Sequence, residues 1–523
     1  MCPGNRGRRL RRKRSSGSGC RPQPGPGEEV IMAEGIKPQV RFLTPAAVEQ
    51  IIDEAFELLE KVGLFVENES ALGLLAGAGE KIDPKRSRVF ISRKLVEKAL
   101  KSCPAEIRLY DLEGTQEYLV GEDEIHFDPG SAAIKLLDPE RLVEREPRTD
   151  DLVRLYQLVE TLENLDFQST ALVSADVPKE MADVYRLYLG FLFCRKPFVT
   201  GIFRVESLKP MLDLLVAIRG DEKSLAEKPL AIFDACPSPP LKWSRLTAES
   251  LVQCSRLGVP SELIPMGLTG ATSPVTLAGT LVQQVAESFG GLVICQLARP
   301  GAPVIFGGSP ASFDMRKGTT PMGAVETMMI NCAFAQIAKH LNLPTHAYMG
   351  LSDSKLVDAQ AGLETALGAV LAGLAGINVI SGAGMLDFES TQSLEKLVID
   401  NDICGQVLRL VRGVALREKP LALHLFQEVG DDFNFLVLPH TRKWYRQEHH
   451  FSSILDRDVY DTWAALGRLD IFQRAQKEVN RRLNLYQRPE LCRKKEEELQ
   501  AIMLAYARSC GLEKLPEIPG LQA

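Results

Sequence analysis

The fold is decided by PTHAYMGLSDSKLVDAQAG, residues 344–362, in which three kinds of sequence follow one another without a gap. The apolar run 344–350 is typical of a buried β-strand, and the polar residues from Ser352 to Asp358 are typical of a loop. The small residues that follow favour a helix. A strand, a short polar loop and a helix in this order form the unit from which parallel α/β proteins are built.

Seven further short apolar runs repeat this rhythm along the chain. They stand at 125–127, 167–173, 198–203, 230–235, 263–267, 303–308 and 377–384. Amphipathic segments lie between them, and the eight runs are spaced roughly 30 to 40 residues apart. Eight strand–helix units fit a (β/α)8 TIM-type barrel better than an open doubly wound sheet. We therefore predict an α/β fold with this barrel over residues 121–413.

Two segments flank the predicted barrel. Residues 32–120 favour helices, because Thr44 is a typical helix cap, Pro45 a typical first helical residue, and Gly63 ends the pattern. Residues 414–523 are expected to form a C-terminal extension that packs on the barrel and offers a surface to other chains.

The first 31 residues differ from all the rest. They are basic, rich in Gly, Pro and Ser, and almost free of apolar side chains. Such a composition buries too little surface to offset chain entropy, so we expect this head to be disordered and dispensable. A natural start at Met32, with the head as a misread extension, explains it best.

The overall composition excludes several classes of protein. The chain has 523 residues, 45% hydrophobic and 25% charged, with a net charge of −6, which argues against nucleic-acid binding. Eleven cysteines without a CxxC pair indicate a reducing, cytoplasmic setting. No uninterrupted apolar run reaches the roughly 18 residues of a membrane span. No metal site is predicted, since His449 and His450 lack further ligands at suitable spacing.

In a barrel of this kind the functional residues stand where the strands end and the loops begin. After the run at 344–350 this rule selects His346 and Tyr348 as catalytic candidates, with Asp353 and Lys355 beside them. Aromatic rings at strand ends are expected to hold a quaternary ammonium ligand by cation–π attraction. These rings are Phe127, Phe233, Phe306 and Phe313.

Five segments together resemble the trimethylamine methyltransferase family. They are FDPGSAA (127–133), MGLTGATSPVTLAGTLVQQVAE (266–287), MGLSDSKLVDAQAGLE (349–364), GMLDFESTQSLEKLVIDND (384–402) and PHTRKWYRQEHHFSSILDRDVYDTW (439–463). The resemblance spans about residues 40–490. It implies a (β/α)8 barrel that moves a methyl group from an amine to the cobalt of a corrinoid. The family also implies that a separate small protein carries this corrinoid, so the cofactor is supplied in trans.

The resemblance also implies roles for individual residues. Small and polar residues at the strand ends are expected to face the corrinoid: Gly267, Thr269, Gly307, Ser309, Asp353 and Gly382. Arg316 and Lys355 are expected to meet a carboxylate on the substrate. The partners implied are a methylated amine and the cognate corrinoid protein, and the chain is expected to form a homo-oligomer.

One departure from the family decides the substrate. The founding members carry pyrrolysine, whereas this chain contains only the twenty standard residues, as in the branch similar to glycine betaine methyltransferase. A quaternary ammonium leaves as a neutral tertiary amine, so its methyl transfer needs positioning and desolvation but no general acid. We therefore expect a quaternary substrate such as glycine betaine.

Three alternatives stay open at this point. The chain is a trimethylamine–corrinoid methyltransferase proper, a barrel lyase or aldolase that uses Lys355 as a Schiff base, or a non-enzymatic protein that binds betaine. The lyase is separated by a borohydride trap, which leaves a covalent adduct only in that case.

Overall fold

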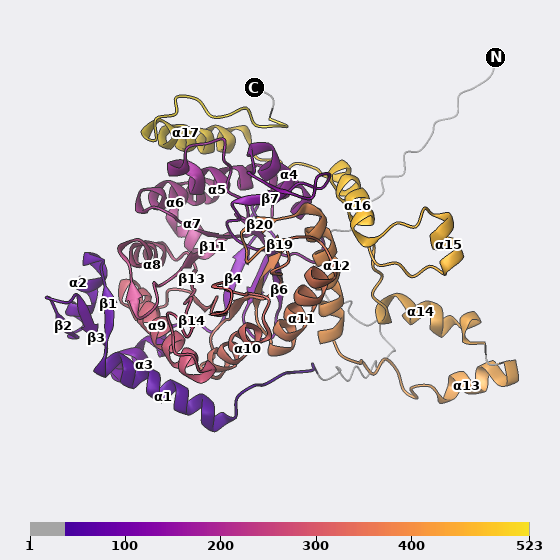
Figure 1. The fold of residues 1–523 in the computed structure, drawn as a ribbon, viewed down its shortest axis with the longest axis horizontal. Helices are drawn as coiled ribbons and strands as arrows, with labels where there is room; N and C mark the ends of the chain where they lie inside the picture. Colours follow the sequence, from indigo (N-terminus) through magenta and orange to yellow (C-terminus); the bar gives the residue numbers. More distant parts are fainter. Residues whose placement is uncertain (1–36, 433, 522–523) are drawn as a thin grey trace, which may run out of the picture.

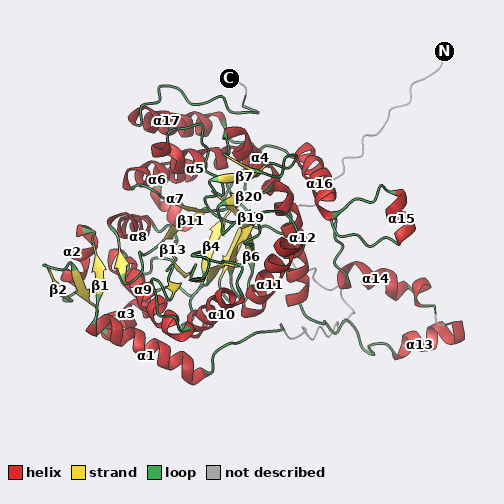
Figure 2. Cartoon of the chain, in the orientation of Figure 1, coloured by secondary structure: helices red, strands yellow, loops and turns green. Residues whose placement is uncertain are grey.

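The structure is a computed structural model that describes residues 37–432 and 434–521. The predicted disordered head, residues 1–31, lies outside the described residues. Strands gather in the middle of the molecule and helices surround them (Figure 2). The α/β class is confirmed.

Eight short parallel strands coincide with the eight predicted runs. They are β6 (His126–Pro129), β9 (Gln168–Ser169), β10 (Phe198–Gly201), β11 (Ala231–Ala235), β13 (Ser261–Leu263), β15 (Val304–Phe306), β17 (His346–Tyr348) and β18 (Val379–Ala383).

These strands form two parallel sheets, ordered β15-β13-β11-β10-β9 and β17-β18-β6. The sheets meet at both edges. The N–H of Phe306 donates to the carbonyl of Pro344 at 2.9 Å, and the N–H of Phe167 donates to the carbonyl of Phe127 at 3.2 Å. Strands that lie side by side therefore follow one another in the sequence, and the last strand, β18, lies beside the first, β6.

The connecting helices cover the outer faces of the strands (Figure 1). They are α4 (Thr149–Glu160), α5 (Ala182–Phe193), α6 (Val205–Arg219), α7 (Glu222–Glu227), α8 (Arg245–Leu257), α9 (Leu277–Ala298), α10 (Val325–His340), α11 (Ala359–Ala375) and α12 (Leu394–Val411). Among the described residues only α9 is long and apolar enough to cross a bilayer, and 89% of its most apolar window is buried inside the protein. It is a core helix.

An antiparallel hairpin fills one end of the strand interior. Its strands are β4 (Ile107–Tyr110) and β5 (Glu117–Val120). Ile107 and Val120 of the hairpin pack in one apolar cluster with Ile232, Ile305 and Val379 of the parallel strands. Because side chains alternate along a strand, the residues two positions further on point into the same interior, one level closer to the carboxyl ends.

The segment before the hairpin packs against α9 and α8. It holds α1 (Pro45–Lys61), α2 (Glu69–Gly77) and α3 (Arg93–Ser102), and the strands β1 (Leu64–Val66), β2 (Lys81–Asp83) and β3 (Arg88–Phe90). These strands form a small sheet with β12 (Lys242–Trp243), which lies after β11 in the chain. The predicted cap is present, since the side chain of Thr44 accepts the N–H of Ala47 at 3.2 Å. The strands of this segment were not foreseen, because three-residue strands leave too little pattern in the sequence.

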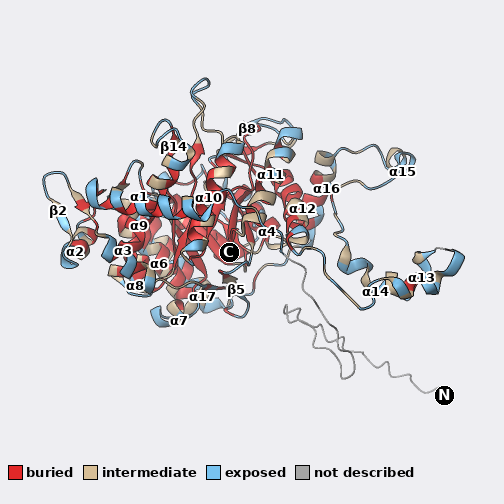
Figure 3. Ribbon diagram, turned by 90° about the horizontal axis from the view of Figure 1, so that it is seen from below, coloured by how far each residue is buried: buried red, intermediate tan, exposed pale blue. Residues whose placement is uncertain are grey.

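Further short strands lie in the loops. They are β7 (Lys135–Leu137), β8 (Glu144–Arg145), β14 (Leu268–Thr269), β16 (Ala311–Ser312), β19 (Met385–Leu386) and β20 (Thr391–Gln392), with the 3-10 turn η1 (Lys179–Met181). Most belong to loops that follow the carboxyl ends of the parallel strands. When the molecule is turned, β8 and β14 appear at the end opposite β5 of the hairpin (Figure 3). We call the end with β8 and β14 the mouth.

The C-terminal part contains α13 (Leu423–Val429), η2 (Gly430–Asp432), η3 (Phe435–Val437), α14 (Pro439–Glu448), α15 (Tyr460–Ala465), α16 (Ile471–Leu485) and α17 (Arg493–Ser509). Helix α16 packs on α12 and α4, and α17 packs on α6 and α5.

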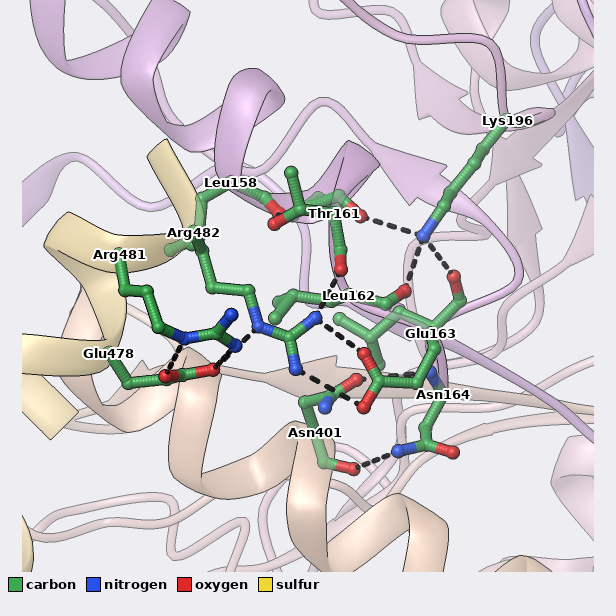
Figure 4. A network of polar contacts seen from close by, with 12 residues as sticks. Leu158, Thr161, Leu162, Glu163, Asn164, Lys196, Asn401, Glu478, Arg481 and Arg482 are labelled. Atoms are coloured by element: carbon green, nitrogen blue, oxygen red, sulfur yellow. Dashed lines mark hydrogen bonds and ion pairs between the residues drawn. The ribbon is translucent and has the colours of Figure 1, made fainter. Parts of the chain in front are cut away.

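A polar network fastens α16 to the body (Figure 4). Arg482 pairs with Glu163 at 2.5 Å and with Glu478 at 2.7 Å, and it also donates to the carbonyl of Thr161. Nearby, the ammonium of Lys196 donates to three carbonyls at 2.6 to 2.7 Å. A guanidinium that is 10% exposed and doubly paired holds its helix firmly.

Candidate active site

Polar side chains occupy the interior above the hairpin cluster. Two positions beyond Ile232 and Val379 stand Asp234 and Ser381, and the register places Glu262, Tyr348 and Asp128 beside them. His346 lies one step lower on β17. These six residues come from five different strands, so the sheets bring together groups that are far apart in the sequence.

His346 is fixed on both sides. Its Nε2 lies 2.9 Å from Oγ of Ser381, which itself donates to Oδ2 of Asp128 at 2.6 Å. The Ser381 oxygen therefore accepts from Nε2–H, and the other ring nitrogen is left without a proton. Burial lowers the pKa of His346 to about 3, which keeps the ring neutral at physiological pH.

The deprotonated Nδ1 of His346 lies 3.1 Å from Oε1 of Glu262, with both side chains fully buried. The pair is close but is not at hydrogen-bonding angles, and both atoms lack a hydrogen-bond partner. Burial, reinforced by the charge of Asp234, raises the pKa of Glu262 well above its usual range. A proton on Glu262 removes the repulsion between its oxygen and the imidazole lone pair.

Two more carboxyl groups share this interior. Burial raises the pKa of Asp234 to about 6, and Tyr348 donates to its Oδ2 at 3.3 Å. Burial also raises the pKa of Asp128 well above its usual range. The guanidinium of Arg186 lowers the pKa of Asp234 in part, but Arg186 itself donates to the carbonyl of Thr170 at 2.6 Å.

Glu389 enters the same interior from a strained loop. Asp387, Phe388 and Glu389 have φ of 46°, 55° and 67°, three successive non-glycine residues in the left-handed region. Each such residue stores free energy, of the order of 1 kcal/mol, and such strain gathers at functional sites. Burial raises the pKa of Glu389 to about 8, and its Oε1 is buried without a partner.

The stability of the protein is expected to fall with rising pH because of Glu389. A carboxyl whose pKa is 4.5 when unfolded and about 8 when folded stabilises the fold fully below pH 4.5, and this contribution is lost as pH rises through 8. Between pH 5 and 8.5 we expect wild type to lose on the order of 2 kcal/mol more than Glu389→Gln. Urea unfolding across this range measures it. The exposed control Glu498→Gln keeps the wild-type slope, and equal slopes for all three proteins would contradict the assignment.

The structure places the four predicted rings in two different environments. Phe306 stacks on Phe334 of α10 with ring centroids 5.9 Å apart and tilts against Phe289 of α9. The ring of Phe306 therefore faces the helices. Phe127 and Phe233 directly precede Asp128 and Asp234, which face the interior, so their rings also point to the helices, because side chains alternate along a strand. The expectation that these three rings meet a ligand is corrected, because the strand ends carry them on the outer face. Phe313 alone lies in a mouth loop, partly exposed.

Phe306→Leu is therefore expected to lower the free energy of unfolding by about 1 to 2 kcal/mol, since it leaves a cavity between sheet and helices. Phe313→Leu, in a mouth loop, is expected to change it by less than about 0.5 kcal/mol. Chemical denaturation of the two variants side by side checks this; equal losses would show that Phe313 is also a core residue.

The predicted cations and Asp353 lie at the mouth, each already paired. Lys355 has a side chain 57% exposed, 3.2 Å from Oδ1 of Asp387 and 4.0 Å from the ring centroid of Phe388. Arg316 is 86% exposed and pairs with Asp314 at 2.8 Å. The carboxylate of Asp353 accepts the N–H groups of Met322 and Gly323, both at 2.9 Å. It orders the loop before α10.

The small residues predicted to face a cofactor serve mainly internal packing. A Cβ on Gly307 would stand 2.9 Å from Nδ1 of His346, and one on Gly382 would stand 2.9 Å from Leu351. Gly267 packs against Ser273 in the same way. Thr269 accepts the N–H of Phe313 at 3.3 Å. Ser309 differs, because its hydroxyl is buried without a partner.

Sequence reasoning missed Glu262 and Glu389 and gave no role to Asp128 and Asp234. A signal was present for Glu262, because it is a charged residue directly before the apolar run 263–267 and belongs to a strand buried at every position. Glu389 left no signal, since its place depends on three left-handed residues in a loop.

The chain has an α/β fold, and its buried polar residues gather toward the carboxyl ends of the parallel strands, where enzymes of this class carry their active sites. The profile described as trimethylamine methyltransferase (MTTB) matches residues 4–510. The chain belongs to the trimethylamine methyltransferase family, and it is a methyltransferase.

Individual relatives span nearly the whole chain. A protein named glycine betaine methyltransferase from Desulfitobacterium hafniense (strain Y51) is 31% identical over 480 residues, covering 91% of this chain and 99% of its own. Trimethylamine methyltransferase MttB from Desulfitobacterium hafniense (strain DSM 10664 / DCB-2) is 32% identical and covers 81% of this chain and 85% of its own. MttB of Methanosarcina thermophila is 31% identical over 84% of this chain and 92% of its own.

Among solved structures, the Methanosarcina barkeri monomethylamine methyltransferase (MtmB) is similar to this chain. It is 13% identical, with a TM-score of 0.45, and the match covers 84% of this chain and 93% of that one.

Proposed function

We propose that this methyltransferase takes its methyl group from a quaternary methylammonium compound such as glycine betaine. The acceptor in this proposal is the cobalt of a corrinoid held by a separate protein. The two parallel sheets are taken to form one closed (β/α)8 barrel over residues 121–413, flanked by segments 32–120 and 414–523. A cytoplasmic location completes the proposal, supported by nine unpaired cysteines among the described residues.

The observation that carries the substrate proposal is the set of carboxyl oxygens in the interior. Five of them are buried without a hydrogen-bond partner, from four residues: Asp128, Asp234, Glu262 and Glu389. In the described part of the chain no Lys or Arg forms an ion pair with any of these residues. Arg186 acts on Asp234 only from beyond ion-pair distance, and buried carboxyls without a paired cation are costly. A methylated ammonium group supplies the missing positive charge, and it needs no hydrogen bond from its surroundings.

The interior residues then have separate roles. Ionised Asp234 lies nearest the cation and balances its charge, and protonated Glu262 lies beside it. Ser381 holds His346 and Asp128 in position through its two hydrogen bonds, and His346 lies 3.1 Å from Glu262 without a hydrogen bond to it. Tyr348 presents its ring to the methyl groups while its hydroxyl stays on Asp234. Lys355, at the mouth, is the nearest of the predicted cations to a substrate carboxylate.

The mouth fits a docking protein that brings a large flat cofactor. Loops at this end expose large apolar side chains, each at least 40% exposed: Ile134, Leu142, Val143, Phe203, Met266, Val275 and Met315. The corrinoid, when its carrier is docked, supplies a cobalt(I) nucleophile. The chain's own task is to exclude water and to point one N–CH3 bond out of the acidic interior toward the mouth.

The geometry gives no support to Lys355 as a Schiff base. Such a lysine is activated by burial in apolar surroundings or beside another cation, whereas Lys355 is mostly exposed and pairs with Asp387. A non-enzymatic role for the family fold is set aside because the chain is a methyltransferase.

Binding calorimetry of the protein alone tests the proposal. Glycine betaine is compared with 3,3-dimethylbutanoate, which has the same shape but a carbon atom in place of the cationic nitrogen. We expect betaine to bind at least tenfold more tightly, and more tightly at pH 8 than at pH 5.5, because the cation favours the ionised form of Asp234. Equal affinities for the two compounds would contradict a cation site.

A further inference from the structure

A cavity of about 490 Å³ lies where the end of helix α12 meets the end of α14. Its lining comes from residues within 405–417 and 446–450, and from Asn164 in the loop after α4. Its floor is bare because Gly405, inside α12, has no side chain. A Cβ on Gly405 would stand 2.6 Å from Cε1 of His450 and 2.8 Å from Nδ2 of Asn164. A glycine inside a helix costs stability, and here it lets three segments meet closely.

The cavity is separate from the acidic interior. Asn164 lies in the loop that leads from α4 into the start of β9, and therefore at the amino ends of the parallel strands. It is bound to Asn401 of α12 by two hydrogen bonds of 3.0 Å (Figure 4). The mouth, by contrast, follows the carboxyl ends of the strands. A ligand in this cavity therefore has no contact with a substrate at the mouth.

The cavity carries an excess of positive charge. Four guanidinium groups line it, and no Asp or Glu of the described chain does. They belong to Arg409, Arg412, Arg417 and Arg446. Among the described residues only Glu448 pairs with any of the four, at 3.2 Å from Arg409 and 2.6 Å from Arg417. Arg412 and Arg446 are exposed and form no ion pair within that part of the chain. Four positive charges against one negative charge leave an excess of three on these five side chains.

Two of the four guanidinium groups are held in place without a ligand. Arg409 donates to the backbone carbonyls of Gly413 and Glu448 at 3.0 and 2.9 Å, which covers carbonyls at the ends of both helices. Uncovered carbonyls there would repel an anion. Arg417 donates through Nε to Glu448 at 2.6 Å, and its guanidinium lies 5.4 Å from the ring centroid of Trp444. Its two terminal nitrogens have no partner among the described residues, and they form the fork that binds oxyanions.

We propose that this cavity binds a small molecule that carries a diphosphate group. Scattered arginines are normal on a protein surface, but four around one cavity with a single paired carboxylate are not. Arginine suits phosphate because its planar fork of N–H groups meets two oxygens at once. A diphosphate carries several negative charges near neutral pH, so it matches the excess better than one carboxylate does. The volume lies within the roughly 300 to 1,000 Å³ of small-molecule sites, which leaves room for the rest of the ligand.

Titration calorimetry of the full chain with pyrophosphate tests the proposal, at a fixed ionic strength of about 0.15 M because salt screens exposed charges. We expect wild type to bind pyrophosphate roughly tenfold more tightly than sulfate, and Arg412→Gln with Arg446→Gln to bind it roughly tenfold more weakly than wild type. The matched control, Arg442→Gln, removes an exposed guanidinium one turn before Arg446 on α14, outside the cavity, and keeps the wild-type affinity. Circular dichroism checks that all three proteins share one fold.

Two further ligands identify the source of the diphosphate. ADP that binds as tightly as pyrophosphate supports a diphosphate ester, and ADP that fails to compete supports free diphosphate. Inorganic phosphate that binds as tightly as pyrophosphate would overturn the diphosphate assignment. So would equal binding of sulfate, no binding of pyrophosphate, or an undiminished affinity in the double variant. None of these measurements involves methyl transfer, so their outcome is independent of the proposed function.

Discussion

Replacing His346 with alanine is expected to abolish methyl transfer and, at the same time, to lower the free energy of unfolding by about 2 to 4 kcal/mol. The sequence alone led us to expect lost activity with an unchanged melting temperature. The structure changes the second half of that expectation. The imidazole is fully buried, and its removal leaves Ser381 and Glu262 facing a cavity.

His346→Gln is the matched variant. Its amide N–H2 can replace Nε2–H as donor to Ser381, so we expect it to recover more than half of the lost stability while activity stays low. Urea unfolding and single-turnover demethylation are measured on both variants. If His346→Ala unfolds like wild type, the residue is not part of the buried network; if His346→Gln is fully active, the imidazole has no role of its own.

Neutralising Asp234 and Glu262 together is expected to have the largest effect on substrate binding. Asp234→Asn with Glu262→Gln keeps the shape of both side chains, removes the charge of Asp234 and leaves neither position able to ionise. A buried charge interaction of this kind contributes about 2 to 4 kcal/mol, so affinity for glycine betaine falls roughly 30- to 1,000-fold. The fold is not weakened, because two buried acids are exchanged for neutral amides.

Calorimetry at pH 8 measures this affinity, with Asp353→Asn as the control. Asp353 is also a buried carboxyl, but its oxygens accept two backbone N–H groups at the mouth. We expect the control to be less stable than wild type and to bind betaine nearly as well. Betaine affinity that survives in the double variant would remove the acidic interior from the substrate site.

The eight parallel strands were predictable because each leaves a strong local signal. All eight runs found in the sequence coincide with parallel strands, including the segment 344–350, which contains β17. Burial on both faces makes such strands read as continuous apolar runs. The three-residue strands β1 to β3 leave no comparable signal, and they form because β1 pairs with β12, far along the chain.

The candidate site was predictable only in part, and the reason is the direction of side chains. Reading strand ends as a set selected His346 and Tyr348, whose side chains face the interior, but it also selected Phe127, Phe233 and Phe306, which face the helices. A one-residue step along a strand reverses the face. The register that decides between Phe233 and Asp234 comes from pairing with β10 and β13, which no single run contains.

A second reason is that the acidic character of the interior is a property of the assembly. Asp128, Asp234 and Glu262 are separated by more than 25 residues from one another and lie in three different strands. The sequence indicated an aromatic pocket with few carboxylates. The structure instead brings four carboxyl groups together and places Phe127, Phe233 and Phe306 on the outer face, so the proposed cation site depends mainly on charge rather than on π faces.

The most direct measurement is a demethylation assay with a panel of amines. The protein, a reduced corrinoid carrier and one amine at a time are incubated without oxygen, and loss of a methyl group from the amine is followed by mass spectrometry. The account predicts that glycine betaine or a related quaternary amine is demethylated, while trimethylamine and dimethylamine are not. Rapid demethylation of trimethylamine with every quaternary compound inert would contradict it.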